Sequence, residues 1–296
     1  MTTRRQFIQQ AGALASAAIL SPAFLTRHKT KYKVGLQLYT IREAMEADLK
    51  GTLKKVASYG YEDLEIYGFS DFKYYGLHPK TFKQILEDNN LSTSSGHYGL
   101  NKFMGPGTSD DDMMRYVDEC IEGAHILKQE YITWPWLDPD SRTLDKFKIV
   151  ADKLNRIGER VKKANLAVAY HNHDFEFIEH DGKIGYDIIL NETDPALVKM
   201  QMDLFWFSHS SKLTTHDYFT KYPGRFVMWH LKDMSKTDRN LHEIMGEGTI
   251  DFKAILKDAE LAGVNYMFVE QGNNYHPDAM QNVAKSSLYV KNVLFK

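Results

Sequence analysis

The sequence has little of several features that mark particular classes of protein. Cysteine occurs once, as Cys120, in 296 residues, so no disulfide can form within the chain and a thiolate metal cluster is excluded. Basic and acidic side chains nearly balance, with 37 Lys and Arg against 39 Asp and Glu. The chain therefore lacks the positive excess that holds a nucleic-acid backbone, and nucleic acid is not an expected partner.

Long apolar runs and phosphate-binding loops are also missing. The apolar run from Ala11 to Leu20 is too short to cross the hydrocarbon core of a bilayer, about 30 Å thick, as a helix, so we expect no stable membrane insertion. The first predicted strand leads into Gln37-Leu38-Tyr39-Thr40-Ile41-Arg42, which is not the glycine-rich turn of a dinucleotide site. No Walker-type loop or arginine cluster offers a phosphate handle.

The first 30 residues have the pattern of an export signal. The segment Thr3-Arg4-Arg5-Gln6-Phe7-Ile8 precedes the apolar run, and Ser21-Pro22-Ala23 follows it. Paired arginines before a modest apolar stretch resemble a twin-arginine signal; the alternative is a surface amphipathic helix with a chance arginine pair. We therefore expect export to the periplasm, and a mature domain that covers residues 31–296.

The remainder of the chain predicts one α/β domain. Its length fits the roughly 250 residues of a (β/α)8 TIM barrel with additions, and short β-branched or aromatic runs alternate with helical periodicity, as in βα units around a parallel sheet. The eight predicted strands are Val34 to Tyr39, Asp63 to Ile66, Ser92 to His97, Tyr131 to Trp134, Ala167 to His171, Val198 to Met202, Arg225 to Leu231 and Tyr266 to Glu270. Helices are predicted at Met45 to Ser58, Pro79 to Asn89, Asp110 to Leu127, Thr143 to Ala164 and Phe252 to Ala262, and a small hairpin at Asp174 to Tyr186.

Four consecutive predicted strands end in residues that can bind a metal. These residues are His171 with His173, Asp203, His230 and Glu270. Taken singly, such an Asp is more often a helix cap and such a His a structural hydrogen-bonding residue. In a barrel, however, the strand ends meet at one mouth, so the four together favour a shared site. A mixed carboxylate and imidazole set suits Mn²⁺, Zn²⁺, Fe²⁺ or Co²⁺ better than Ca²⁺.

The order and spacing of several segments resemble the sugar phosphate isomerase/epimerase superfamily, the xylose isomerase-like TIM barrels. The resemblance covers nearly all of the mature chain. The segments that carry it are Val34 to Tyr39, Gly60 to Glu65, Gly96 to Leu100, Tyr170 to Phe177, Met202-Asp203, Trp229 to Asp233, Gly246 to Phe252 and Phe268 to Glu270.

This resemblance implies a single divalent metal, with Mn²⁺ as the first choice and Zn²⁺, Fe²⁺, Co²⁺ or Mg²⁺ as alternatives. In the family the ligands are Glu, Asp, His and Glu, and Asp203, His230 and Glu270 match the last three. His171 stands where the first Glu is expected. Either this imidazole or the nearby Glu176 is therefore the fourth ligand.

The resemblance also implies proton transfer next to a carbonyl of a sugar or sugar derivative, through a metal-stabilised enediolate. Glu270 would be the base, with His173 or His171 as its acid partner. Glu65 and His97 match positions that line the substrate cavity in the family.

Further candidates for substrate contact follow from their places at strand ends. They are Glu176, Trp206 and Lys232, and Trp134, Trp136 and Phe205 are either sugar-stacking or core residues. Asp233 either orients a ligand imidazole or pairs with Lys232.

Two other functions remain open at this point. The nearest is a metal-dependent lyase, hydrolase or dehydratase acting on a keto-glycoside or keto-polyol, since a base and an acid on one substrate also suit elimination. The other is a non-catalytic sugar-binding barrel. A homo-oligomer is compatible with either, and a repair endonuclease is disfavoured by the missing basic surface.

Overall fold

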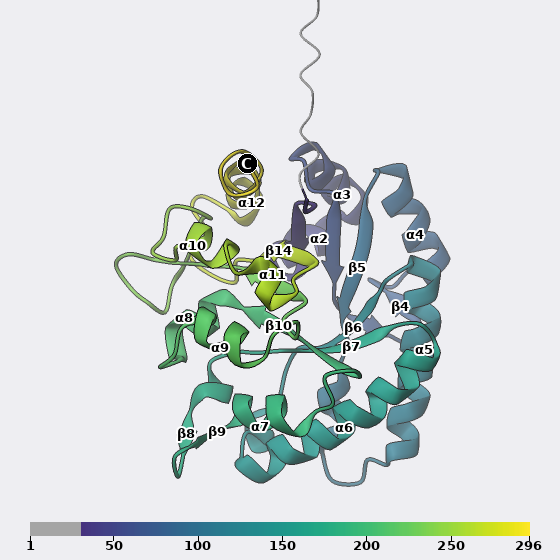
Figure 1. Ribbon diagram of the computed structural model, residues 1–296. Coiled ribbons are helices and arrows are strands. Elements are labelled where there is room, and N and C mark those ends of the chain that lie inside the picture. Colours follow the sequence, from purple (N-terminus) through teal and green to yellow (C-terminus); the bar gives the residue numbers. More distant parts are fainter. Residues whose placement is uncertain (1–30) are drawn as a thin grey trace, which may run out of the picture. The chain divides into compact units, whose positions relative to one another are not determined.

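The computed structural model describes residues 31–296 (Figure 1). The predicted export signal lies outside the described residues and stays a prediction. Within the described part of the chain, no helix is both long and apolar enough to cross a membrane.

Eight parallel strands close into a barrel, in the order β1-β14-β11-β10-β7-β6-β5-β2. Each strand therefore pairs with its neighbours along the chain, and β1 closes the barrel by pairing with both β14 and β2. The strands are β1 Gly35–Gln37, β2 Asp63–Ile66, β5 Ser92–His97, β6 Tyr131–Trp134, β7 Ala167–His171, β10 Val198–Asp203, β11 Met228–Leu231 and β14 Tyr266–Val269. The predicted (β/α)8 barrel is confirmed.

Helices cover the outside of this barrel (Figure 1). They are α2 Arg42–Ala47, α3 Leu49–Ser58, α4 Pro79–Asp88, α5 Asp110–Leu127, α6 Leu144–Lys163, α7 Gly185–Glu192, α8 Leu204–Ser210, α9 Thr215–Lys221, α10 Phe252–Leu256, α11 Ala259–Ala262 and α12 Ala279–Tyr289. In α6 the cap Thr143 accepts from the amide of Lys146, and the stripe that includes Phe147, Leu154 and Val161 is buried. Each such side chain contributes roughly 1.5–3 kcal/mol on burial.

Some predicted boundaries are wrong for local reasons. The stretch Met45 to Ser58 is two helices, because Asp48 leaves the helical region (φ −155°, ψ 87°) and its carboxylate caps α3 at Gly51. The strand expected from Arg225 begins only at Met228. The buried Arg225 guanidinium instead bonds Leu190 O and Thr193 Oγ1.

Three small hairpins follow the carboxyl ends of barrel strands. They are β3–β4 (Phe69–Ser70 and Lys73–Tyr74) after β2, β8–β9 (Glu179–His180 and Lys183–Ile184) after β7, and β12–β13 (Asp233–Met234 and His242–Glu243) after β11. The second of them confirms the predicted hairpin. All three therefore lie at the face where barrel enzymes build their sites.

Candidate active site

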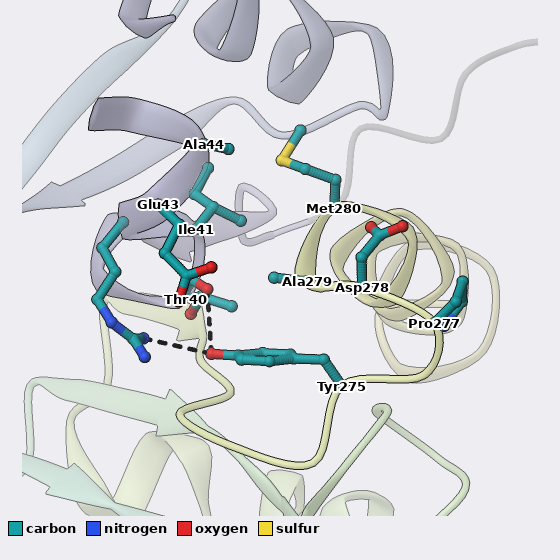
Figure 2. Close-up of a pocket in the computed structure, with 10 residues that line it drawn as sticks. Thr40, Ile41, Glu43, Ala44, Tyr275, Pro277, Asp278, Ala279 and Met280 are labelled. Atoms are coloured by element: carbon teal, nitrogen blue, oxygen red, sulfur yellow. Dashed lines mark hydrogen bonds between the residues drawn. The ribbon is translucent and has the colours of Figure 1, made fainter. Parts of the chain in front are cut away.

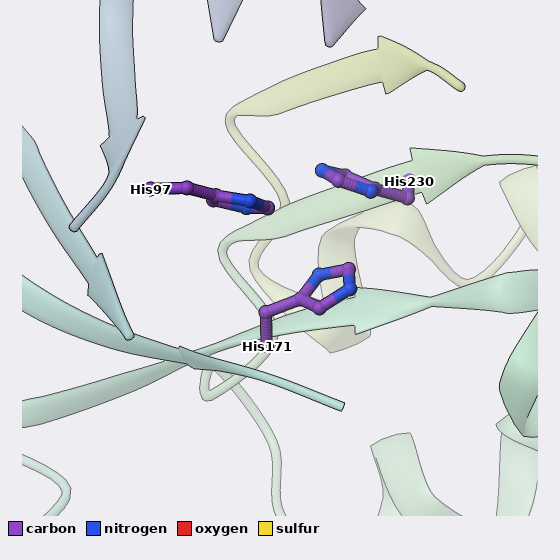
Figure 3. A group of neighbouring side chains, drawn as sticks. All are labelled: His97, His171 and His230. Carbon is purple, nitrogen blue, oxygen red and sulfur yellow. The ribbon is translucent and has the colours of Figure 1, made fainter. Parts of the chain in front are cut away.

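Three histidines from different strands meet at the carboxyl end of the barrel. His97, His171 and His230 point toward one another (Figure 3), with ring centroids 4.5 to 5.4 Å apart. His171 and His230 are buried, and His97 is partly exposed. His97, His171 and His230 are far apart in the sequence, and they are neighbours at this end of the barrel, as expected for residues of one site.

Asp203 and Glu270 join this cluster beside His230. The ligand-capable atoms of these three residues all lie within 4.8 Å of one another. His230 Nδ1 is 2.8 Å from Glu270 Oε2 and 3.9 Å from Asp203 Oδ2, and His171 Nε2 is 3.8 Å from the same Asp203 oxygen. Donor atoms from β10, β11 and the end of β14 therefore lie together, and His171 Nε2, from β7, lies beside one of them, Asp203 Oδ2.

Gln201, on β10, determines which nitrogen of His171 belongs to this group. Its amide nitrogen donates to Glu65 Oε1 at 2.6 Å, which leaves Oε1 to accept from His171 Nδ1 at 2.9 Å and from His97 Nε2 at 2.8 Å. Since an amide oxygen only accepts, Nδ1 of His171 carries its proton. The lone pair of Nε2 then faces Asp203, and this is the orientation that a metal ligand needs.

His97, unlike His171, has a protein partner at each of its two ring nitrogens. Its Nε2 donates to Gln201, and its Nδ1 accepts from the Gln37 amide at 3.2 Å. Both ring nitrogens therefore have protein partners, and the imidazole keeps no lone pair for a cation. Of the two groups of possible ligands, the one made by Asp203, His230 and Glu270 is the better metal site.

Glu65, on β2, is an internal anchor of the cluster. Its fully buried carboxylate accepts from the side chains of Gln37, Ser95, Gln201 and His230, and His97 Nε2 lies 3.0 Å from it. Burial alone would raise its pKa, but His97 and His230 outweigh burial and lower it. Protein donors already occupy the lone pairs of the Glu65 carboxylate. The sequence predicted that Glu65 contacts a substrate hydroxyl, whereas in the structure it binds protein side chains. It orients His230 by accepting from Nε2 at 2.5 Å, so that Nδ1 faces Asp203 and Glu270.

Lys232 supplies the positive charge between the two ligand carboxylates. Its Nζ lies 2.8 Å from Asp203 Oδ2 and 2.7 Å from Glu270 Oε2, and the residue is only 3% exposed. Burial would lower the pKa of this ammonium, but Asp203 and Glu270 raise it. Strand alternation places Lys232 on the same side as His230 and Asp233 on the other. Asp233 accordingly accepts from the backbone of Gly246, Gly248 and Ile250 and does not pair with Lys232.

Glu176 lies outside the ligand group. It sits on the turn η4 (Phe175–Phe177), where its carboxylate accepts from Tyr170 Oη at 2.7 Å and from the His173 amide at 2.8 Å. Burial raises its pKa to about 8. Neighbouring residues of a strand point to opposite sides, so Tyr170 points away from the cluster that contains His171. Glu176 is bonded to Tyr170 and therefore also lies on that other side. Of the two residues predicted as alternatives for a fourth ligand, His171 lies beside Asp203, whereas Glu176 is bonded to Tyr170 and the His173 amide.

A cavity of about 470 Å³ opens beside the cluster. This cavity is lined by His171, His173 and Glu270. It is also lined by aromatic residues, which include Tyr39, Tyr67 and Trp136. Burial lowers the pKa of His173 well below its usual range, so this imidazole is neutral, and its Nδ1 is buried without a hydrogen-bond partner. His173 thus lines the cavity as a neutral imidazole, which is the form that accepts a proton.

The four aromatic residues that were candidates for contact with a sugar lie in different environments. Trp136 lines the cavity and is 39% exposed, whereas Trp134 and Phe205 are fully buried core residues. Trp206 is partly buried, with its ring 5.5 Å from Lys232 Nζ and 5.8 Å from the ring of His173.

A second hollow, of about 330 Å³, lies between the segment after β1 and the loop that leads into α12 (Figure 2). Tyr275 Oη donates to Thr40 O at 3.1 Å and accepts from Arg42 Nη1 at 3.4 Å. Tyr275, Thr40 and Arg42 are thus bonded to one another at this hollow, and none of the residues that line it belongs to the histidine and carboxylate cluster.

A closed barrel with a polar centre at the strand ends is the architecture of (β/α)8 barrel enzymes. Comparison with known families gives the finer class: a family model described as Xylose isomerase-like TIM barrel matches residues 53–291. The chain belongs to the xylose isomerase-like TIM barrel family.

Individual proteins similar to this chain have names from two reaction classes. A sugar phosphate isomerase/epimerase from Parabacteroides distasonis is 26% identical, with a TM-score of 0.77 over 92% of this chain and 97% of that one. An inosose dehydratase from Geobacillus thermodenitrificans is 25% identical over 143 residues, which are 43% of this chain and 47% of that protein. The matched part thus spans less than half the length of that relative. The fold is also similar to an IOLI protein with a binding zinc atom, at 15% identity and a TM-score of 0.70 over 89% and 99% of the two chains.

Proposed function

We propose that this protein is a divalent-metal-dependent isomerase or epimerase acting on a sugar or sugar derivative. One observation carries the proposal: Asp203, His230 and Glu270 bring ligand-capable atoms within 4.8 Å of one another. His171 Nε2 lies 3.8 Å from Asp203 Oδ2, and His171 and Glu270 line the neighbouring cavity. The donor set of carboxylates and imidazoles suits Mn²⁺, Zn²⁺, Fe²⁺ or Co²⁺. The resemblance to the family makes Mn²⁺ the first choice, and Mg²⁺ is a further alternative.

The residues fit such an ion in charge as well as in position. Asp203 Oδ2 is buried and accepts no well-directed hydrogen bond, although the Lys232 ammonium is close to it; it is a charged oxygen that requires a cation. A divalent ion bound there would polarise a substrate carbonyl and its neighbouring hydroxyl, and would stabilise the charge that proton removal creates.

Glu270 is the proposed base. It lines the cavity, and although burial would raise its pKa, Lys232 and His230 hold that pKa well below its usual range, so it is a carboxylate at neutral pH. His173 lines the same cavity as a neutral imidazole, so it can accept a proton from the substrate and then, as the imidazolium so formed, return it at a second position. His171 is the alternative partner, but Gln201 holds its Nδ1 proton.

A second candidate is a lyase or dehydratase that acts on a keto-polyol or keto-glycoside. The partial likeness to an inosose dehydratase favours it, and so does the presence of a carboxylate and an imidazole on one cavity, since elimination needs both a base and a group that carries a proton to the leaving oxygen. A non-catalytic sugar-binding barrel is the third reading.

One experiment separates these candidates. The purified chain is analysed for bound metal and then incubated in D₂O with ketoses, keto-polyols and keto-glycosides, followed by NMR. Deuterium in a recovered or epimerised sugar supports the isomerase or epimerase, whereas loss of water or release of an aglycone supports the second candidate. Absence of both metal and turnover would leave only a binding role. Glu270→Gln, which removes the base, is the inactive control.

We also propose that the protein is exported to the periplasm by the twin-arginine route. The arginine pair and the apolar run after it support this proposal. Cell fractionation tests it with the double change Arg4→Lys and Arg5→Lys. The altered chain should stay unprocessed in the cytoplasm, and normal export of that chain would argue against a twin-arginine signal.

A further inference from the structure

The ammonium of Lys232 stands where a cation would be held by Asp203 and Glu270. Its Nζ is within 2.8 Å of both Asp203 Oδ2 and Glu270 Oε2, and these oxygens belong to two ligands of the proposed metal site. A divalent ion on the same oxygens would approach each to roughly 2.0–2.2 Å. Lys232 would then be left as a buried positive charge beside a second one, with its acceptors taken.

The surroundings of Lys232 explain why a cation belongs there. Three carboxylates, those of Glu65, Asp203 and Glu270, lie close to the imidazole of His230 in a buried space. Buried carboxylates without a compensating positive charge are strongly unfavourable. Lys232 is thus the counter-ion that keeps Asp203 and Glu270 charged and in place.

The substrate cavity lies next to this ammonium. Glu270 lines the cavity, Lys232 Nζ lies 2.7 Å from Glu270 Oε2, and a lysine carries its charge on a flexible four-carbon stem. The ring of Trp206, 5.5 Å from Nζ, offers a favourable aromatic face close to the ammonium. An ammonium released into the cavity would donate to substrate oxygens.

We propose that Lys232 is a resident counter-ion of the metal centre, and that metal binding displaces its ammonium into the substrate cavity, where it contacts the substrate. The inference rests on the proposed function because it requires that the proposed ligands bind a metal. It goes beyond that function by assigning Lys232 two positions and two partners.

Lysine labelling measures this displacement directly. The EDTA-treated full chain is exposed briefly to a small acetylating reagent, with and without saturating Mn²⁺, and acetylation of each lysine is read by mass spectrometry. We expect Mn²⁺ to increase acetylation of Lys232 several-fold. Lys148, which is solvent-exposed on α6, is the internal reference and should not change. Binding of Mn²⁺ by calorimetry with Lys232 still protected would overturn the displacement and leave the proposed function standing.

A matched pair of variants adds a second measurement. Lys232→Met keeps the length of the side chain and removes the competing charge, so we expect it to bind Mn²⁺ at least tenfold more tightly than the unaltered chain. Lys199→Met, on β10 and bonded to Pro195 O, removes a lysine elsewhere and should leave the affinity unchanged. If only Lys232→Met bound Mn²⁺, Lys232 would be a permanent replacement for the metal, and both proposals would fail. Equal affinities of Lys232→Met and the unaltered chain would overturn the displacement alone.

Discussion

Gln201 holds the ring of His171 through one hydrogen bond, from Nδ1 to Oε1 at 2.9 Å, and this bond decides that Nε2 faces Asp203. The same amide oxygen accepts from His97, and the amide nitrogen donates to Glu65. One buried side chain therefore sets the tautomers of two histidines and braces the carboxylate that orients a third, His230. Such outer partners commonly govern metal affinity as much as ring orientation.

Replacement of Gln201 should therefore weaken metal binding without touching a ligand. In Gln201→Met the shape is nearly kept, but His171 loses the acceptor that fixes its tautomer, and we expect the affinity for Mn²⁺ to fall about 10–100-fold. The loss of buried hydrogen bonds should also cost about 1–3 kcal/mol of stability. Calorimetric titration of this variant against Gln84→Met, an exposed helix position, makes the comparison. Unchanged affinity in Gln201→Met would remove the assigned role.

Asp203 combines a structural and a chemical role that two substitutions separate. Its Oδ1 caps α8 by accepting from the amides of Phe205 and Trp206 at 2.9 and 3.1 Å, while Oδ2 faces the cluster. Asn is also a good helix cap, so Asp203→Asn should keep the cap but lose the ligand charge, and Asp203→Ala should lose both. We expect neither variant to hold stoichiometric metal, and the Ala variant to be less stable than the Asn variant by about 1 kcal/mol. Metal analysis and denaturant unfolding give the two readouts, and full metal content in Asp203→Asn would contradict the ligand assignment.

The sequence predicted the barrel and the ligand side of this site better than its interior. Strand ends are readable because β-branched runs stop at polar residues, and Asp203, His230 and Glu270 meet as expected. The roles of Gln37 and Gln201 were not predictable, because a buried amide within a strand has no distinguishing pattern until its partners are known. Strand phase alone also could not show that Glu65 is saturated by protein donors or that Lys232 lies between two carboxylates.

The pKa of His230 predicts how the stability of the metal-free protein varies with pH. Burial opposes the imidazolium, but Glu65 and Glu270 outweigh it and raise the pKa from 6.5 to about 10. A raised folded-state pKa contributes stability that is fully present below the unfolded value and is lost as the pH rises through the folded value. We therefore expect the free energy of unfolding of EDTA-treated protein to fall as the pH rises from 6.5 toward 10.

The measurement of unfolding free energy needs a variant that lacks Glu176, because this second group also makes stability fall as the pH rises. Burial raises the pKa of Glu176 to about 8, so its contribution also declines as the pH rises. Denaturant titrations of Glu176→Gln remove the contribution of Glu176 and leave that of His230. The affinity for Mn²⁺ should rise over the same range, because Nδ1 must lose its proton to bind. If both quantities were constant across this range, His230 would not be an imidazolium between the two carboxylates.

Two tryptophans near one another in sequence should respond oppositely to truncation. Trp134 is fully buried, so Trp134→Ala should destabilise the fold by about 3–5 kcal/mol. Trp136 is 39% exposed and lines the cavity, where its ring packs edge-on against His173 at 4.9 Å between centroids. Since its loss removes one wall of the cavity, Trp136→Ala should leave stability within about 1 kcal/mol. Its KM for the substrate should rise roughly tenfold, the equivalent of one aromatic contact worth about 1.4 kcal/mol.

Denaturant unfolding and steady-state kinetics on both variants test this contrast. Trp136→Phe is the matched control, because it keeps an aromatic wall and should restore most of the binding. A KM for Trp136→Ala equal to that of the unaltered chain would mean that the substrate does not reach this wall. The binding contacts would then have to come from other aromatic residues of the cavity, such as Tyr39, which is 47% exposed next to Tyr67.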